Sequence, residues 1–344
     1  MKAFSGVMSR IGIDLGSSQI RMYAGNRVVL AENSVAVIDN SSGAAVGFGV
    51  NALVRYHGAP EKYHLEWPVK HGVIVDYALT KGMLQYFLEK VMHRAVTRPS
   101  VALSIPSGTS SVVRHALIDA VLHAGAQHGY LISAPAAAVL GAKQSLVLSE
   151  ATLAAVIGRD VTDCGLFSCG GVVAEEAVPF GGHNIDNGIR NYMMEKYRIL
   201  IGSEMAETIK QEAASAVKPS EVRAINVRGR RAADGVEVLL TMTAQELYPI
   251  IQLLLLPVTR LIRRVIRTAQ PEMAEDLLKN GMLLAGGSAL LAGISDWVAS
   301  EVGIPVFVPE EPENVVAAGC LAALNEYRKL PDIIENGEMY YGRE

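Results

Sequence analysis

The sequence has few cysteines, few aromatic residues and no strong excess of either charge. Its three cysteines form no CxxC pair in 344 residues, which excludes a disulfide framework and is typical of reduced thiols in the cytoplasm. The 31 basic and 35 acidic residues give a net charge of −4. A nucleic-acid-binding domain usually carries a basic excess, so we expect no nucleic-acid partner.

Long apolar runs and a secretory signal are also missing. No run approaches the roughly 20 residues that span a bilayer, and residues 1–10 lack the apolar core of a signal peptide. We therefore expect a cytoplasmic protein. Half of the residues are apolar and 19% are charged, and this composition excludes a disordered chain.

One hydrophobic pattern occurs twice along the chain. Three short apolar runs joined by tight turns open each half, and they predict strands at 10–15, 19–24 and 27–30, then at 152–157, 162–168 and 172–178. Each half closes with a strand, a long helix, a second strand and an alanine-rich helix, over 101–142 and 282–323. Strands at 34–38 and 44–48 are expected to continue the first sheet.

The two halves predict an α/β fold of two duplicated lobes around a central cleft, a common place for a ligand. The length agrees with about two domains. We predict a first lobe over residues 1–148, with a small subdomain at about 31–75. The second lobe is predicted over 149–344, with a small subdomain at about 187–250.

The first motif with chemical meaning is Gly12-Ile-Asp14-Leu-Gly16-Ser17-Ser18. An aspartate ends an apolar strand, and a glycine with two serines makes a tight turn. Successive N–H groups of such a turn can point at phosphate oxygens, and the carboxylate can hold a hydrated Mg²⁺. An ordinary hairpin with polar turn residues explains the same motif, and both interpretations stay open.

The second motif is Leu283-Leu-Ala followed by Gly286, Gly287, Ser288 and Ala289. We interpret it as a buried strand, two glycines and the start of a helix at Ser288. Backbone donors and the positive end of a helix dipole would suit a phosphate or a nucleobase. A strand-to-helix turn capped by Ser288 is the alternative.

These two motifs, in this order on a duplicated α/β pattern, resemble the actin-like ATPase superfamily. The resemblance sharpens to the bacterial MreB family of rod shape-determining proteins, of which the chain would be a divergent member. Further stretches carry it, namely Lys70-His-Gly-Val-Ile-Val-Asp-Tyr, Gly181-Gly-His-Asn-Ile-Asp186, Ile201-Gly-Ser-Glu-Met-Ala-Glu-Thr-Ile-Lys210 and Gly281-Met-Leu-Leu-Ala-Gly-Gly-Ser. It covers roughly residues 9–327.

The resemblance implies an actin-like fold whose cleft binds ATP and Mg²⁺, with the metal held through water by Asp14. It places the first phosphate loop, one glycine of the second loop, the helix beside the adenosine and the adenosine-side turn on Asp14, Gly16, Ser17, Ser18, Gln19, Gly158, Glu207, Lys210, Gly286, Gly287, Ser288 and Ala289.

The second phosphate loop departs from the family. The family reads Asp-Ile-Gly-Gly-Gly-Thr-Thr where this chain reads Val156-Ile-Gly158-Arg159-Asp160-Val-Thr. Val156 cannot ligate a metal. The side chains of Arg159 and Asp160 would obstruct backbone approach to phosphates, although Arg159 could also attract one. We therefore expect weaker ATP binding than is usual for the family.

The catalytic acid is also missing. The family reads Glu-Glu-Pro where this chain reads Ser133-Ala134-Pro135. Ala134 has no group to orient water, so no catalytic residue is assigned, although a relay through Ser133 or Asp163 stays open. We expect weak or lost ATP hydrolysis.

The resemblance implies a cytoskeletal protein that stacks head to tail into membrane-associated filaments and helps determine cell shape. Its partners would be further copies of itself, an authentic MreB and membrane proteins of cell-wall synthesis. Peripheral contact with the inner face of the cell membrane would use residues 1–10, where Phe4, Val7 and Met8 have helical spacing. The alternatives are a nucleotide-insensitive adaptor that co-assembles with an authentic MreB, and a small-molecule kinase of the same superfamily.

Overall fold

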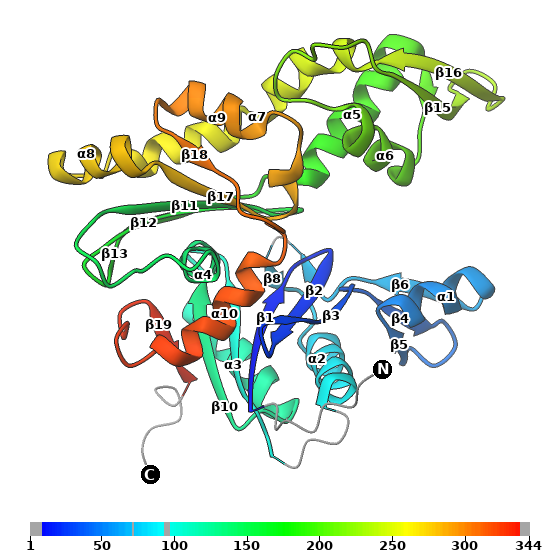
Figure 1. The fold of residues 1–344 in the computed structure, drawn as a ribbon. Helices are drawn as coiled ribbons and strands as arrows, with labels where there is room; N and C mark the ends of the chain where they lie inside the picture. The colour runs from blue at the N-terminus through cyan, green and yellow to red at the C-terminus, as the bar shows by residue number, and fades with distance from the viewer. Residues whose placement is uncertain (1–8, 71, 93–96, 338–344) are drawn as a thin grey trace.

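The computed structural model describes residues 9–70, 72–92 and 97–337, and two lobes lie one above the other in Figure 1. The lower lobe is built on a six-stranded sheet with the order β19-β10-β9-β1-β2-β3. Its strands are β1 (Arg10–Leu15), β2 (Gln19–Ala24), β3 (Arg27–Asn33), β9 (Ser100–Ile105), β10 (His128–Ser133) and β19 (Ile334–Asn336).

The upper lobe repeats this topology in a five-stranded sheet with the order β13-β12-β11-β17-β18. Its strands are β11 (Thr152–Ile157), β12 (Thr162–Ser168), β13 (Gly171–Val178), β17 (Met282–Ala285) and β18 (Val306–Phe307). In both sheets an antiparallel three-stranded meander is followed by two parallel strands. The predicted duplication is therefore confirmed.

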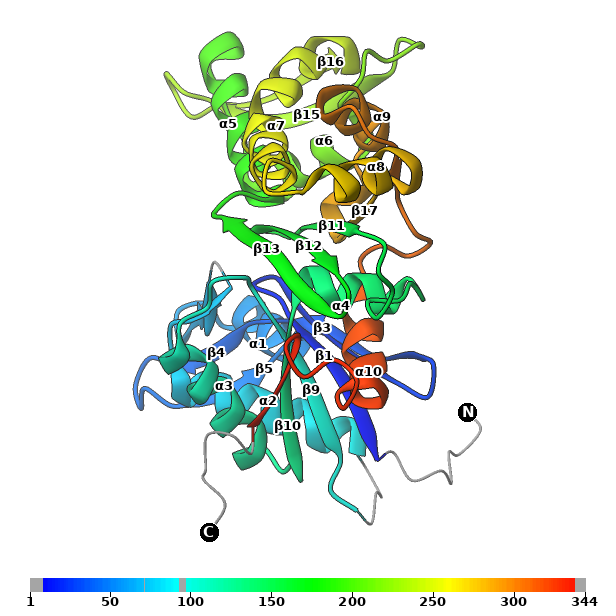
Figure 2. The ribbon, with the colours of Figure 1, turned by 90° about the vertical axis from the view of Figure 1, so that its left-hand side faces the viewer.

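Two helices rich in small residues lie between the sheets, α4 (Ala134–Gly141) and α10 (Val315–Glu326) (Figures 1 and 2). They approach so closely that a Cβ on Gly319 would lie 1.7 Å from the carbonyl oxygen of Ala137. Their buried side chains share one core with strands of both lobes, including Ile132 of β10 and Val156 of β11. The alanine-rich sequences are thus explained by the need for close packing at the junction.

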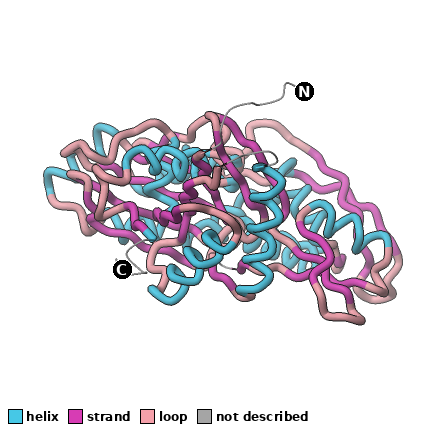
Figure 3. The backbone as a smooth tube through the Cα atoms, turned by 90° about the horizontal axis from the view of Figure 1, so that it is seen from below, coloured by secondary structure: helices cyan, strands magenta, loops and turns pink. Residues whose placement is uncertain are grey.

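The other helices are divided between the two lobes, and helices and strands occur along the whole length of the molecule (Figure 3). Those of the lower lobe are α1 (Val50–Gly58), α2 (Tyr77–Met92) and α3 (Ser111–His123). Those of the upper lobe are α5 (Gly182–Tyr197), α6 (Ser203–Ala213), α7 (Ala244–Ile266), α8 (Pro271–Asn280) and α9 (Ile294–Val302). Among the described residues, no helix is long and apolar enough to cross a bilayer.

Smaller sheets project from each lobe. The lower one has the order β5-β4-β6, and the upper one β14-β15-β16. Their strands, with the two-stranded β7-β8 ribbon, are β4 (Ala36–Asp39), β5 (Ala45–Phe48), β6 (Tyr63–Glu66), β7 (Val69–Lys70), β8 (Val73–Ile74), β14 (Ile199–Leu200), β15 (Ala224–Arg231) and β16 (Glu237–Thr243). The prediction that strands at 34–38 and 44–48 continue the main sheet is wrong, because β4 and β5 pair with β6 and close over their own core of Val35, Val37 and Ala52.

The chain returns to the lower lobe at its end. Helix α10 packs on α4 and β1, and β19 pairs with β10. The sequence prediction assigned these elements to the second lobe, 149–344, whereas in space they pack on the first lobe. Residues 1–8, which include the predicted membrane contact of Phe4, Val7 and Met8, lie outside the described residues.

Candidate functional site

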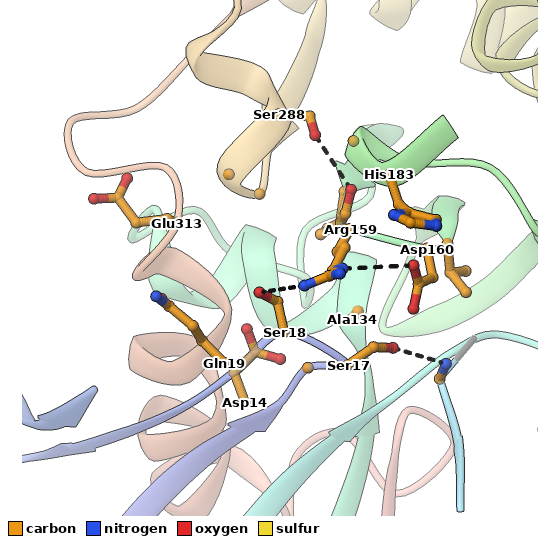
Figure 4. Close-up of a pocket in the computed structure, with 18 of the residues that line it drawn as sticks. Asp14, Ser17, Ser18, Gln19, Ala134, Arg159, Asp160, His183, Ser288 and Glu313 are labelled. Atoms are coloured by element: carbon orange, nitrogen blue, oxygen red, sulfur yellow. Dashed lines mark hydrogen bonds and ion pairs between the residues drawn. The ribbon is translucent and has the colours of Figure 1, made fainter. Parts of the chain in front are cut away.

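A cleft of about 690 Å³ lies between the lobes, and this volume is that of a typical small-molecule site. All the predicted nucleotide-binding residues except Ala289 line it, together with Ala134 and Val156. Ala289 is buried in the core of the upper lobe. The structure thus brings the two sequence motifs, which are far apart in the chain, to one cleft (Figure 4).

The two candidate phosphate loops are copies of one turn. After β1, the backbone N–H of Gly16 donates to the carbonyl of Gln19 at 3.1 Å; after β11, that of Gly158 donates to Val161 at 2.9 Å. Each turn therefore spans four residues and faces the cleft from its own lobe. The duplicated fold explains why the two turns match although their sequences differ.

Asp14 is the last residue but one of β1 and lines the cleft. One carboxylate oxygen accepts a hydrogen bond from the Ser104 hydroxyl at 2.9 Å, which fixes the side chain. Burial raises the pKa of Asp14, although the Ser104 bond and the charge of Arg21 oppose that rise. The adjacent Ser17 hydroxyl accepts from the backbone N–H of Gly72 at 3.5 Å.

The residues around Asp14 fit a hydrated magnesium ion that shares ligands with a nucleotide, and they do not fit an ion held by protein alone. Magnesium commonly takes one or two carboxylates, several waters and substrate phosphates. Asp14 supplies one carboxylate, whereas Val156 faces the cleft with an apolar side chain. Among the described residues, no group of three or more His, Cys, Asp or Glu could hold a metal.

The second loop is anchored from behind by the upper lobe. The carbonyl of Gly158 accepts from the N–H of Gly182 at 3.0 Å and from the Ser288 hydroxyl at 3.2 Å. The carbonyl of Arg159 accepts from the N–H of His183 at 2.8 Å. The first N–H groups of α5 therefore hold this loop.

The adenosine-side turn differs from the predicted helix start. A 3₁₀ turn, η1 (Gly287–Leu290), follows β17, and α9 begins only at Ile294. The break begins at Leu291, whose backbone is extended, and Gly293, with a left-handed φ of 69°, is the residue before α9. The prediction of a continuous helix from Ser288 is therefore wrong, and only a four-residue 3₁₀ turn begins at Gly287.

Glu207 and Lys210 of α6 both line the cleft. Lys210 is engaged within the protein, since its ammonium lies 2.8 Å from the carboxylate of Asp186 on α5. It also donates to the carbonyl of Gly182 at 3.4 Å. Lys210 therefore fixes α6 against α5, and Glu207 is the more available of the two predicted contacts.

Sequence reasoning gave no role to several residues that line the cleft, including Arg21, His183, Asp186 and Glu313. His183 and Asp186 belong to the Gly181–Asp186 stretch that supported the resemblance, so a signal for them was present. Glu313 precedes α10, and only the return of that helix to the junction brings it to the cleft.

Asp163, which the sequence left open as a relay, is buried beside the cleft. One carboxylate oxygen accepts from the N–H of Ser107 at 2.8 Å, and the other has no hydrogen-bond partner. Burial raises the pKa of Asp163 to about 7, and the neighbouring charge of Glu175 adds to the rise. The Ser133 hydroxyl donates to Glu175 and is engaged there.

Comparisons with known proteins agree with this architecture. The family model described as MreB/Mbl protein matches residues 8–332. The cell shape-determining protein MreB of Escherichia coli K12 is 37% identical over 331 residues, covering 93% of this chain and 94% of its own. The cell shape-determining protein Mbl of Bacillus subtilis is 30% identical over 323 residues, covering 93% and 97%.

Solved structures show the same relationship. MreB 5 of Spiroplasma citri bound to AMPPNP superposes with a TM-score of 0.84 at 25% identity, covering 93% of this chain and 97% of its own. A MamK double helical filament, at 17% identity and a TM-score of 0.76, covers 92% and 98% and shares the fold. The fold is actin-like, and the chain belongs to the MreB/Mbl family.

Proposed function

We propose that this protein binds ATP in the cleft between its lobes and assembles head to tail into actin-like filaments that help determine cell shape. The observation that carries the proposal is the pair of matching turns, Gly16–Gln19 and Gly158–Val161, which face one cleft from opposite lobes. The relatives named cell shape-determining proteins support the cellular role. The AMPPNP-bound MreB 5 and the MamK filament support nucleotide binding and self-association.

The proposal places the protein in the cytoplasm, with peripheral contact at the inner face of the cell membrane. Its partners are further copies of itself, an authentic MreB and membrane proteins of cell-wall synthesis. Asp14 would hold, through water, the magnesium that accompanies the nucleotide. This arrangement suits the single carboxylate of the first turn.

Assembly is the first expected result. Purified protein should pellet above a critical concentration and form filaments visible by electron microscopy, because a head-to-tail contact is open-ended. Sedimentation over a concentration series, with ATP and with AMPPNP, measures this. Polymers should persist equally with both nucleotides, since Ala134 and Val156 stand where the family carries carboxylates and turnover is expected to be lost. Monomers at high concentration, with nucleotide, liposomes and MreB all present, would rule the filament proposal out.

Nucleotide binding is the second expected result. Replacing Asp14 by Asn keeps its shape and its bond to Ser104 but removes the charge that attracts magnesium. We expect the magnesium-dependent part of ATP binding to fall about tenfold, as loss of one charged ligand costs roughly 1–3 kcal/mol. Calorimetric titration with magnesium and with EDTA measures this. Equal magnesium dependence in both proteins would contradict the assignment of Asp14.

A nucleotide-insensitive adaptor is the second candidate. Val156 and Ala134 lack carboxylates, and Arg159 bonds across the cleft to Ser18. An adaptor would pellet with an authentic MreB in nucleotide-free buffer and would give no heat with ATP. The titration described for Asp14 therefore separates the two candidates.

A further inference from the structure

The side chain of Arg159 crosses the cleft from the upper phosphate loop to the lower one (Figure 4). Its Nη1 atom donates to the Ser18 hydroxyl at 3.3 Å, and its Nε atom lies 3.9 Å from the Asp160 carboxylate. In the duplicated turns, Arg159 is the counterpart of Ser17, the first residue after the glycine. The upper turn therefore places a cation where the lower turn places a hydroxyl.

The backbone beneath Arg159 is held in place. Its carbonyl and that of Gly158 accept bonds from the first N–H groups of α5. Gly181 allows this contact, because a Cβ there would lie 2.5 Å from the carbonyl carbon of Arg159. A loop anchored from behind must project this side chain into the cleft, and the guanidinium needs little reorganisation to meet a ligand there.

The contacts of Arg159 are weak and leave much of its capacity unused. A guanidinium has five N–H donors, and the hydrogen bond to Ser18 uses one of them at long distance. Its side chain is 44% exposed, whereas that of Asp160 is 11% exposed. Asp160 draws the Nε edge toward the upper loop, so the Nη atoms point across the cleft.

The cleft holds more acids than bases, which makes the position of each cation important. Its lining includes the carboxylates Asp14, Asp160, Asp163, Asp186, Glu207 and Glu313 and the cations Arg21, Arg159, Arg190 and Lys210. Lys210 is paired with Asp186, and Arg21 lies opposite Asp14 in the β1–β2 ladder. Arg159 is the cation that contacts both phosphate loops.

We propose that Arg159 is the phosphate-binding residue of the second loop, exchanging its bond to Ser18 for bonds to the phosphate oxygens of the nucleotide. Its side chain takes over the task that backbone N–H groups perform in a glycine-rich loop. A guanidinium binds a phosphate through two parallel charge-assisted hydrogen bonds, which are roughly twice as strong as a neutral one. The long bond to a serine hydroxyl is easily replaced. This inference rests on the proposed binding of ATP.

The test compares adenosine, ADP and ATP on the unmodified protein, Arg159→Ala and Arg159→Lys, by calorimetric titration in magnesium buffer. For Arg159→Ala we expect ATP affinity to fall about tenfold to a hundredfold while adenosine affinity stays unchanged, because only phosphate contacts are lost. The ATP affinity of Arg159→Lys should lie between that of Arg159→Ala and that of the unmodified protein, since an ammonium keeps the charge without the paired donors. Arg267→Ala, at the end of α7 and outside the cleft, removes the same charge and should bind like the unmodified protein.

The possible results separate the two proposals. Unchanged or tighter ATP binding by Arg159→Ala would overturn the role of Arg159 and leave nucleotide binding intact. Equal losses for adenosine and ATP would also overturn it, because a distorted cleft would weaken both. If the unmodified protein binds none of the three compounds, both this inference and the proposed ATP binding fail.

Discussion

Phosphate release from ATP by the unmodified protein is expected to be at least a hundredfold slower than in a variant whose acids are restored. General acid–base catalysis and water orientation contribute about 10²- to 10⁴-fold to such reactions. Here the wall of the cleft at Ala134 presents a methyl group, and Val156 presents an isopropyl group. Neither can orient or deprotonate water.

The neighbouring polar groups do not replace them. Ser133 caps α4 and donates its hydroxyl proton to Glu175. Asp163 is 3% exposed and bound to the Ser107 N–H. Burial raises its pKa to about 7, a value that suits a general base, so it is burial and not the pKa that keeps Asp163 from activating water.

The rescue variant is Ala134→Glu with Val156→Asp, with Arg159 kept. A glutamate at the first position of α4 is favoured by the positive end of the helix dipole and faces the cleft. Val156 lies opposite Asp163 in the β11–β12 ladder, so the added aspartate meets a like charge, and Ala134→Glu alone is tested beside the double variant. Ala134→Met has the length of glutamate without its oxygens and serves as the control.

Steady-state phosphate release, measured with a coupled assay at saturating ATP, tests the prediction of slow hydrolysis. The double variant should exceed the unmodified protein about a hundredfold or more, and Ala134→Met should not. Brisk release by the unmodified protein would contradict the prediction. Loss of that release in Asp163→Asn would then assign the catalytic role to Asp163.

The elements predicted best from sequence are those whose signals are local. Strands β1, β2, β11, β12 and β17 begin and end as predicted, because turn residues bound each apolar run. Helices α1 and α8 were not predicted, and both are short, with 9 and 10 residues. The helix expected from Ser288 is interrupted at Leu291, whose backbone is extended, and a Cβ on Gly293 would lie 2.4 Å from Val217 Cγ2.

The motif residues of the site were predictable from sequence, whereas its contacts and lining residues such as Arg21 and Glu313 were not. Asp14 and the Gly286-Gly287 turn follow from motifs, and the structure places both at the cleft. The bond from Arg159 to Ser18 joins residues far apart in the chain. It depends on how the two sheets sit across α4 and α10, a packing that no local pattern encodes. The Asp163 oxygen that has no hydrogen-bond partner likewise results from packing between distant segments, which no local pattern encodes.

Replacing Asp163 by Asn is expected to change how stability depends on pH. Burial holds the pKa of Asp163 at about 7, well above the ordinary value of 3.8. Between about pH 4 and pH 7 the folded protein therefore keeps a proton that the unfolded chain has released. Stability must fall as pH rises through this window, and the loss is complete above pH 7.

The size of this pH effect follows from the difference between the pKa of Asp163 in the folded protein and its ordinary value. One pKa unit corresponds to about 1.4 kcal/mol, so this carboxyl should cost about 2–4 kcal/mol at pH 8 relative to pH 4. Asparagine stays neutral and can still accept from Ser107. The N–H donors of the asparagine amide have no partner, which lowers the unfolding free energy by an amount that does not change with pH. The informative quantity is therefore how the difference in unfolding free energy between variant and parent changes with pH. That difference should rise by about 2–4 kcal/mol from pH 4 to pH 8.

Urea unfolding at several pH values measures this difference. The other titratable groups are present in both proteins, so their contributions to the unfolding free energy cancel. Glu246, for example, has its pKa lowered to about 2 by its bonds to Lys196 and Tyr197. The stability that Glu246 contributes to the protein is lost as pH falls below about 4.5, in both proteins alike. Asp332→Asn, at an exposed carboxylate, should run parallel to the parent at every pH. If Asp163→Asn also runs parallel, the carboxyl is ionised in the folded protein and the cleft is wetter than its packing indicates.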